Sequence, residues 1–213
     1  MVERLVILGA GGHAKMVIDV ARSQGRYEPV LCLARDVDPT QRVLGIEVAV
    51  EHQQRLQALQ LEGVAAFPAV GDNNVRRKLL LKLQQLGFHV PTLVAANAWL
   101  SPSAQLGAGT VLMPGATVGS DARVGDGVII NTHASVDHDC HLADYCHVGP
   151  GTTLAGNVRL GEAAFLGAGS VVIPEQTIGA RAIVGAGGVV VSQIPDDELW
   201  VGCPARFLKR LPS

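Results

Sequence analysis

The chain has 213 residues and a formal net charge of −2, and 48% of its residues are hydrophobic, which is enough for a globular core. Its charged residues are interspersed and form no basic stripe of the kind that follows a nucleic-acid backbone. Its apolar stretches are too short for a secretory signal or a membrane span, so we expect a cytoplasmic protein with no nucleic acid and no membrane as partner.

Residues 1–91 have the pattern of a small α/β unit that opens on a glycine turn. The stretch RLVILGAGGHAKMVIDVARSQG combines an apolar strand, a turn and an amphipathic helix, and Gly9, Gly11 and Ala14 spell G-x-G-x-x-A. Glycines in such a turn let the backbone approach a pyrophosphate, and the free N–H groups at the start of the helix attract its charge. The pattern therefore predicts a site for a nucleotide diphosphate.

The rest of this unit supplies two further strands. The stretch EPVLCLARD predicts a second strand ending at Asp36, where a dinucleotide enzyme places its ribose-binding acid. A third strand, a turn at residues 71–74 and another helix follow, and we expect the basic cluster 76–78 on a solvated face of that helix. Because 91 residues are too few for a two-half dinucleotide fold, a mononucleotide or nucleotide sugar is favoured over NAD.

From Val94 onward every sixth residue is aliphatic. The series comprises Val94, Leu100, Leu106, Leu112, Val118, Val124, Ile130, Val136, Leu142, Val148, Leu154, Leu160, Leu166, Val172, Ile178, Val184 and Val190. A mostly small residue comes four positions after each of them, and glycine often follows directly. This period fits a short strand and a corner repeated around a parallel β-helix, in which three sides close one coil and residues 18 positions apart stack. We predict this helix over residues 94–194, in a domain of residues 92–195 followed by a tail, 196–213.

The stretch NTHASVDHDCHLADYCHVGPG holds four histidines. In the phase set by Val136, His138 lies at a corner, His141 and His147 point outward from flat sides, and His133 lies near the preceding corner. None is expected in the core. No pair has the stacked spacing of a zinc site within one chain, although zinc held between subunits stays open.

The order of parts and several motifs resemble one enzyme family. The motifs are GAGGHAK, GDNNVRRK, IINTHASVDHDC, CHVGPGTTLAGNVRLGEAAFLGAGS and VGCPARFLKRL. They are similar to those of the sialic-acid O-acetyltransferases and nucleotide-amino-sugar N-acetyltransferases, which are hexapeptide-repeat acyltransferases. The nearest likeness is to N-acetyltransferases of 4-amino-4,6-dideoxy sugars, linked to UDP as in bacillosamine precursors or to GDP as in GDP-perosamine.

The resemblance implies a Rossmann-like nucleotide-sugar-binding domain followed by a left-handed parallel β-helix. It also implies acetyl-CoA as co-substrate, no metal, a homotrimer with active sites between subunits, and a role in bacterial surface glycan synthesis. UDP-sugar members carry an acidic pair after the second strand, whereas here Ala34 and Arg35 precede Asp36, so the base of the nucleotide stays open.

An imidazole, with an ordinary pKa of about 6.5, is suited to take the proton that a sugar ammonium must lose before its nitrogen attacks a thioester. By resemblance, His138 is this general base and Asp139 orients its ring. The residues implied to contact acetyl-CoA are His147, Gly156, Gly167 and Ala168, with the Gly156 N–H holding the carbonyl oxygen. The residues implied to bind the acceptor are Gly9, Gly11, Gly12, His13, Asp36, Gly71, Asn73 and Asn131.

The expected mechanism is direct acetyl transfer without a covalent enzyme intermediate. Cys140 and Cys146 occupy inward small-residue positions, which argues against a cysteine nucleophile. His138 and His147 are half a coil apart on different sides, so they can cooperate only between neighbouring chains. This spacing independently favours the homotrimer.

Other functions stay open at this point. A sugar hydroxyl, for example on sialic acid, would be served by the same base. A nucleotide-binding β-helix trimer without catalysis would also explain the repeat and the glycine turn. An NAD reductase is the least favoured alternative, because no substrate domain follows the β-helix.

Overall fold

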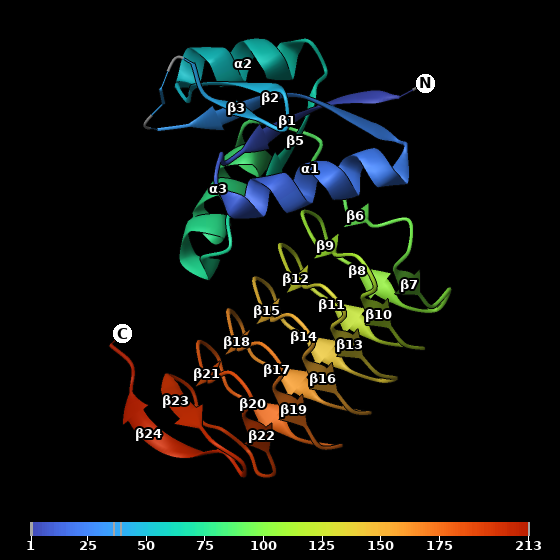
Figure 1. Ribbon diagram of the computed structural model, residues 1–213, viewed down its shortest axis with the longest axis vertical. Helices are drawn as coiled ribbons and strands as arrows, with labels where there is room; N and C mark the ends of the chain where they lie inside the picture. Colours follow the sequence, from blue (N-terminus) through green and yellow to red (C-terminus); the bar gives the residue numbers. More distant parts are fainter. Residues whose placement is uncertain (1, 36, 39, 213) are drawn as a thin grey trace. The chain divides into compact units, whose positions relative to one another are not determined.

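The computed structural model describes residues 2–35, 37–38 and 40–212. The chain forms two compact units, residues 1–96 and 97–213. The elements of the first unit are β1 (Glu3–Leu8), α1 (Gly12–Gln24), β2 (Tyr27–Ala34), β3 (Arg42–Val43), β4 (Ile46–Val50), α2 (Gln53–Leu61), β5 (Ala65–Pro68), α3 (Asn73–Gln85) and β6 (Leu93–Val94) (Figure 1).

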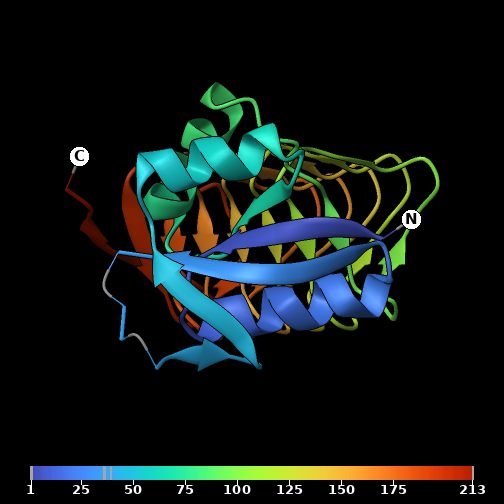
Figure 2. The same cartoon turned by 90° about the horizontal axis from the view of Figure 1, so that it is seen from above.

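The first unit is built on one sheet with the strand order β3-β4-β2-β1-β5. All neighbours are parallel except the pair β3–β4. Helix α1 lies on one side of this sheet and α2 on the other (Figure 2), and the apolar end of β1, from Leu5 to Leu8, is accordingly fully buried. Because β1 and β5 are parallel neighbours, the turns that follow them meet at one edge of the sheet.

The glycine turn and the helix behind it form as the sequence predicts. α1 buries Ala14, Val17, Ile18 and Ala21, the spacing of one helical face, and ends at Gly25 in the left-handed conformation. The strands β3 and β4 and helix α2 were not predicted. α2 buries only two of its residues, Leu56 and Leu59, and so carries a weak periodic signal.

The second unit is the predicted parallel β-helix, with three faces of stacked two-residue strands. Face A comprises β7 (Trp99–Leu100), β10 (Thr117–Val118), β13 (Ser135–Val136), β16 (Thr153–Leu154), β19 (Val171–Val172) and β22 (Val189–Val190). Face B comprises β8 (Gln105–Leu106), β11 (Arg123–Val124), β14 (His141–Leu142), β17 (Arg159–Leu160) and β20 (Thr177–Ile178). Face C comprises β9 (Val111–Leu112), β12 (Ile129–Ile130), β15 (His147–Val148), β18 (Phe165–Leu166) and β21 (Ile183–Val184).

Neighbouring coils pair in register, 18 residues apart. Thr117 pairs with Ser135 and Val118 with Val136, and the same offset recurs on each face. The repeated aliphatic residues point inward and are buried from Leu112 to Val190, whereas Leu100 and Leu106 in the first coil are half-buried. The six-residue pattern thus reports the interior of the coil directly.

The last elements of the chain extend face C. β23 (Glu198–Val201) pairs in parallel with β21, and β24 (Arg206–Arg210) pairs antiparallel with β23. Within the described ranges, none of the helices is both long and apolar enough to cross a membrane.

Candidate active site

His138 lies at the corner between faces A and B, which we call the AB edge, between β13 and β14. Its Nδ1 lies 2.8 Å from Oδ2 of Asp139, the next residue, which stands in the left-handed conformation at φ 58°. A carboxylate can only accept a hydrogen bond, so Nδ1 of a neutral His138 carries the proton and Nε2 carries the lone pair. The Asp139 side chain therefore makes the orienting contact, and it leaves the basic Nε2 of His138 facing away from the carboxylate.

Two carboxylates raise the pKa of His138 above its ordinary value, chiefly through the hydrogen bond that the ring donates to Asp139 and then through the charge of Asp137. Oδ1 of Asp137 also accepts the backbone N–H of His138 at 2.7 Å. Asp137 is a solvent-exposed residue at the same corner. Although exposed, it fixes the backbone of the histidine and adds to the basicity of its ring.

Gly156 is the residue stacked on His138 in the next coil. A Cβ at this position would lie 2.6 Å from Cε1 and 2.7 Å from Nε2 of His138, so only glycine leaves room for the ring as placed. The N–H of Asn157 donates to the His138 carbonyl at 2.9 Å. Among the described residues the N–H of Gly156 itself makes no hydrogen bond, and it is available beside the imidazole.

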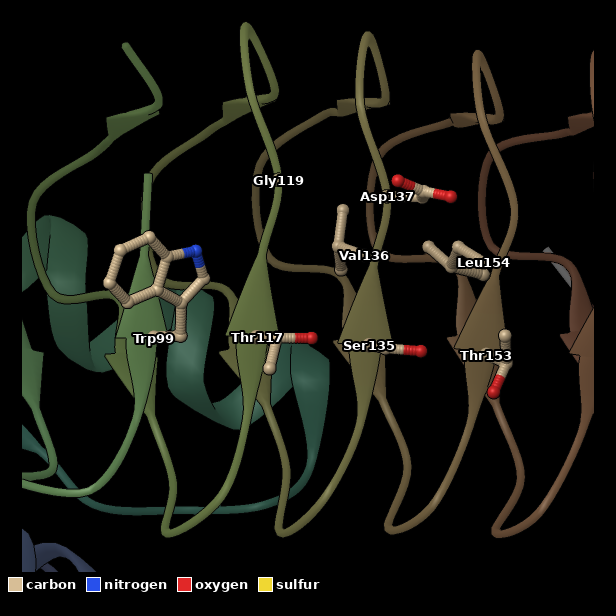
Figure 3. A pocket seen from close by; sticks show the side chains of 8 residues that line it. All are labelled: Trp99, Thr117, Gly119, Ser135, Val136, Asp137, Thr153 and Leu154. Carbon is tan, nitrogen blue, oxygen red and sulfur yellow. The ribbon is translucent and has the colours of Figure 1, made fainter. Parts of the chain in front are cut away.

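A groove of about 210 Å³ runs over face A beside this corner. Figure 3 shows a row of outward side chains along it, Thr117, Ser135 and Thr153, with Trp99 at one end, and Asp137 also lines the groove. Trp99 is 63% exposed, which is unusual for so large an aromatic side chain. The groove offers hydroxyl groups and an aromatic surface to a reactant that approaches the AB edge.

His147 lies on face C and makes a second cluster. Its Nε2 is 3.1 Å from Nδ2 of Asn131, whose Oδ1 already accepts the N–H of Thr132 at 2.8 Å. The amide nitrogen of Asn131 therefore faces the ring, Nε2 of His147 accepts, and its proton sits on Nδ1. The ring also packs edge-on against Phe165 at 5.1 Å and is only 8% exposed, so His147 is not a core residue, as expected, but it is buried beside Phe165.

The predicted residues of the β-helix fall into two groups at two different edges. His138, Asp139 and Gly156 lie at the AB edge, whereas Asn131 and the pair Gly167 and Ala168 lie at the corner between faces C and A, which we call the CA edge. His147 contacts Asn131 and belongs to the second group.

Within the second group, Gly167 is buried against the next coil, and its Cβ would lie 2.5 Å from the nitrogen of Ala186. The packing of the coils therefore requires glycine at position 167, whereas Ala168 beside it is exposed.

The first unit holds the predicted nucleotide turn. Gly9, at φ 136°, passes so close to the turn after β5 that a Cβ would lie 2.6 Å from the Ala69 carbonyl oxygen. A Cβ on Gly11 or Gly12 would meet nothing within 4 Å. Their smallness is therefore not required by the described part of the chain, and it fits close approach of a ligand.

The helix behind this turn begins without a side-chain cap. The N-cap of α1 is Gly11, whereas His52 caps α2 and Asp72 caps α3 by accepting backbone N–H groups. An uncapped helix N-terminus presents donors and a partial positive charge to an anion.

His13 and Asn73 lie on the first turns of α1 and α3. Burial, and then the charge of Arg76, lowers the pKa of His13 to about 4, so its ring is neutral at neutral pH. Its Nε2 is buried and has no hydrogen-bond partner among the residues described. Oδ1 of Asn73 accepts a hydrogen bond from Arg76 at 2.8 Å, and Gly71 is half-buried in the same turn.

Two other expectations for this unit have different outcomes. Arg76 was expected on a solvated helix face and is instead 1% exposed, while Arg77 and Lys78 are exposed as expected. Asp36, the predicted ribose-binding residue, lies outside the described residues.

His133 and His141 are exposed on the β-helix. The thiols of Cys140 and Cys146 are buried and donate to the carbonyls of Ala155 and Gly161, and burial raises the pKa of Cys140. These two cysteines are therefore structural. Across residues 2–35, 37–38 and 40–212, no three His, Cys, Asp or Glu side chains gather in a group that could hold a metal ion.

Comparison with known proteins assigns each unit to a described domain. Residues 4–83 match the model of the PglD N-terminal domain, and residues 121–156 match that of the bacterial transferase hexapeptide with six repeats.

Several solved structures are similar over nearly the whole chain. A histidine mutant of perosamine N-acetyltransferase from Caulobacter crescentus, in complex with CoA and GDP-perosamine, is 45% identical, with a TM-score of 0.91 and 98% of each chain covered. The acetyltransferase domain of PglB from Neisseria gonorrhoeae FA1090, in complex with acetyl coenzyme A, is 37% identical, with a TM-score of 0.92 over 98% of this chain and 100% of that one. WeeI from Acinetobacter baumannii AYE is 26% identical, with a TM-score of 0.87 over 96% and 99%.

Proposed function

The chain belongs to the family of nucleotide-amino-sugar N-acetyltransferases, and from this premise we propose that it acetylates the amino group of a nucleotide-linked 4-amino-4,6-dideoxy sugar with acetyl-CoA. The likeness to the GDP-perosamine enzyme at 45% identity favours GDP over UDP as the carrier. The observation that carries the proposal is the His138–Asp139 pair above Gly156, a base whose free nitrogen lies beside an available N–H.

In the proposed reaction the sugar amine attacks the thioester carbonyl carbon. Nε2 of His138 takes the proton that the amine loses, and the backbone N–H of Gly156 stabilises the negative charge that develops on the carbonyl oxygen. The C–N bond forms, the C–S bond breaks, and the proton passes from His138 to the leaving sulfur, so the products are an amide and free CoA. Asp139 keeps the imidazole in the tautomer that this proton path needs.

The second cluster has a matching role. We assign His147, whose Nε2 accepts a hydrogen bond from Asn131, together with Gly167 and Ala168, to the bound acetyl-CoA. Asn131 is also the predicted contact to the acceptor sugar. No metal has a part in this mechanism.

Since the two clusters lie on different edges, the proposed site is completed by a neighbouring copy of the chain. The AB edge of one subunit would face the CA edge of the next, and a closed ring of three gives each edge a partner. The proposed assembly is thus a homotrimer with three shared sites.

The nucleotide is assigned to the first unit. The uncapped start of α1 with Gly11 and Gly12 suits the diphosphate, and Gly9 brings this turn against the turn after β5. His13 and Asn73 add polar groups at the same sheet edge, where Nε2 of His13 needs a partner. An unsatisfied buried nitrogen costs about 1–3 kcal/mol, which a ligand group would recover.

The test is CoA thiol release from acetyl-CoA with a panel of GDP-, UDP- and dTDP-linked 4-amino sugars. Each acceptor is paired with the same sugar carrying a hydroxyl in place of the amine. We expect release with an amino sugar and little with its hydroxyl counterpart. Faster release with the hydroxyl sugar would identify an O-acetyltransferase, and no release with any acceptor would contradict an acetyltransferase of nucleotide sugars.

A further inference from the structure

Arg76, on the first turns of α3, is among the largest fully buried side chains of the described part of the protein. Its Nη1 donates to the carbonyl of Gly71 at 2.9 Å and to that of Val70 at 3.3 Å, and its Nη2 donates to Oδ1 of Asn73 at 2.8 Å. One planar guanidinium thus holds both the backbone and a side chain of the turn after β5.

The contact with Arg76 determines the orientation of the Asn73 side-chain amide. A guanidinium can only donate hydrogen bonds, so the group facing Arg76 must be the carbonyl oxygen. The opposite end of the Asn73 side chain carries N–H donors, which suit the oxygens of a phosphate or a sugar. Without Arg76 the amide could rotate and present its oxygen, which an anionic ligand repels.

The turn that Arg76 holds lies against the predicted nucleotide turn. β1 and β5 are parallel neighbours, and Gly9 approaches the Ala69 carbonyl so closely that a Cβ would clash with it. The charge of Arg76 also contributes to the low pKa of His13, which places the guanidinium near the start of α1. A displacement of the turn after β5 would therefore also displace the predicted nucleotide turn after β1.

We propose that Arg76 is a positioning residue for the nucleotide diphosphate of the acceptor, acting through the turn of residues 70–73 and the orientation of Asn73. The proposal rests on the proposed function, because it assumes that the ligand at this sheet edge is a nucleotide. Arg76 itself is buried beneath the turn and need not touch the ligand.

The experiment measures the affinity of the full-length protein for GDP and, separately, for UDP and dTDP by calorimetry, with CoA as the control ligand. Arg76→Lys keeps a buried cation but loses the planar fork, and Arg76→Gln removes the charge as well. We expect the better-bound nucleotide to bind about 10- to 100-fold more weakly to both variants, with unchanged affinity for CoA. Arg77→Lys and Arg77→Gln, one residue further on and exposed, are the matched controls and should bind as the parent protein does.

A double-mutant cycle distinguishes positioning from a general loss of stability. If Arg76 acts through Asn73, then Arg76→Lys combined with Asn73→Ala should bind nucleotide little worse than Asn73→Ala alone. If the two residues acted independently, the fold-losses of nucleotide affinity from the two single substitutions would multiply in the double variant. Steady-state kinetics should show a raised KM for the nucleotide sugar with kcat and the KM for acetyl-CoA nearly unchanged.

Unaltered nucleotide affinity in a folded Arg76→Lys protein, multiplicative losses in the cycle, or an equal loss of CoA affinity would each overturn the positioning role. If Arg76→Gln does not fold, Arg76→Lys and the cycle still decide. Failure of the unmodified protein to bind GDP, UDP or dTDP would instead overturn the nucleotide acceptor of the proposed function, and the positioning role with it.

Discussion

His138 is held by contacts that span only a few residues of sequence and one neighbouring coil. Asp139 occupies its Nδ1, Asp137 holds its backbone N–H, and Gly156 leaves the space in which the ring lies. Neither of the two hydrogen bonds involves Nε2. The side chain is 60% exposed, so it contributes little to the core of the β-helix.

Replacing His138 by Ala should therefore leave the fold and the affinity for acetyl-CoA intact while lowering turnover by about 10²–10⁴-fold. Raising the pH should recover part of the loss, because more of the acceptor amine is then already deprotonated. The measurement is initial velocity against pH with the preferred amino sugar, beside sedimentation and CoA binding. Near-normal turnover at neutral pH would remove His138 from the mechanism and make His147 or His141 the next candidate.

Asp139→Asn changes the basicity of His138 in a defined direction. Asp139 is the main cause of the raised pKa of His138, so its neutral replacement should lower that pKa. Because the reaction needs the unprotonated ring, the acidic limb of kcat/KM should move to lower pH, and the plateau should fall by less than in His138→Ala. An NMR titration of the His138 ring gives the shift independently of the acceptor amine, and an unmoved titration would contradict the assigned pair.

At the scale of elements, the turn between β1 and α1 uses two of its glycines for different reasons. Gly9 is required by the chain itself, since its φ is positive and a Cβ would meet the Ala69 carbonyl. Gly12 opens α1, and a Cβ there would meet open space. The G-x-G-x-x-A signature specifies Gly9 and leaves the position of Gly12 open, so it does not show these two roles, whereas the structure does.

Gly12→Ala should consequently fold at least as well as the parent protein, with a stability gain of up to about 1 kcal/mol from the less flexible unfolded chain. Its affinity for nucleotide should fall about tenfold, or about 1.4 kcal/mol, because the methyl group occupies the ligand's side of the turn. Gly9→Ala is the contrasting variant and should lose about 1–3 kcal/mol of stability through backbone strain. Thermal unfolding and calorimetry measure both, and unchanged nucleotide binding in Gly12→Ala would move the ligand away from this turn.

The elements that the sequence predicted are those whose environment is set by local periodicity. Every inward residue of the β-helix from Leu112 onward sits on the same axis, so one rule of six describes them all. The burial of Arg76 was not predicted because it depends on hydrogen bonds such as those to the backbone carbonyls of Val70 and Gly71, and the sequence around Arg76 shows only a charge cluster. The burial of His147 depends on Phe165, a full coil away, and follows only once the coils are stacked.

At the scale of the whole molecule, the β-helix places its two candidate functional clusters at different edges. The 18-residue coil repeat puts Gly156 directly beside His138, and it keeps the Asn131–His147 pair on another side of the same prism. A rigid stack of coils has no hinge that could bring these clusters together within one chain. The sequence spacing of nine residues between the two histidines already contained this separation, although it could not show which other residues accompany each histidine.

The separation makes a sharp prediction for assembly, because a shared site can be rebuilt from two damaged chains. His138→Ala and His147→Ala homomers should each be nearly inactive, and the parent protein should sediment as a trimer. When the two variants are unfolded and refolded together in equal amounts, random assembly places an intact AB edge against an intact CA edge at about one quarter of the sites, and activity should return to about that fraction. Mixing the two folded proteins without exchange of subunits is the control and should restore nothing. Hybrids with no more activity than the separate variants would mean that each chain carries a complete site or none, and an active monomer would refute the shared site directly.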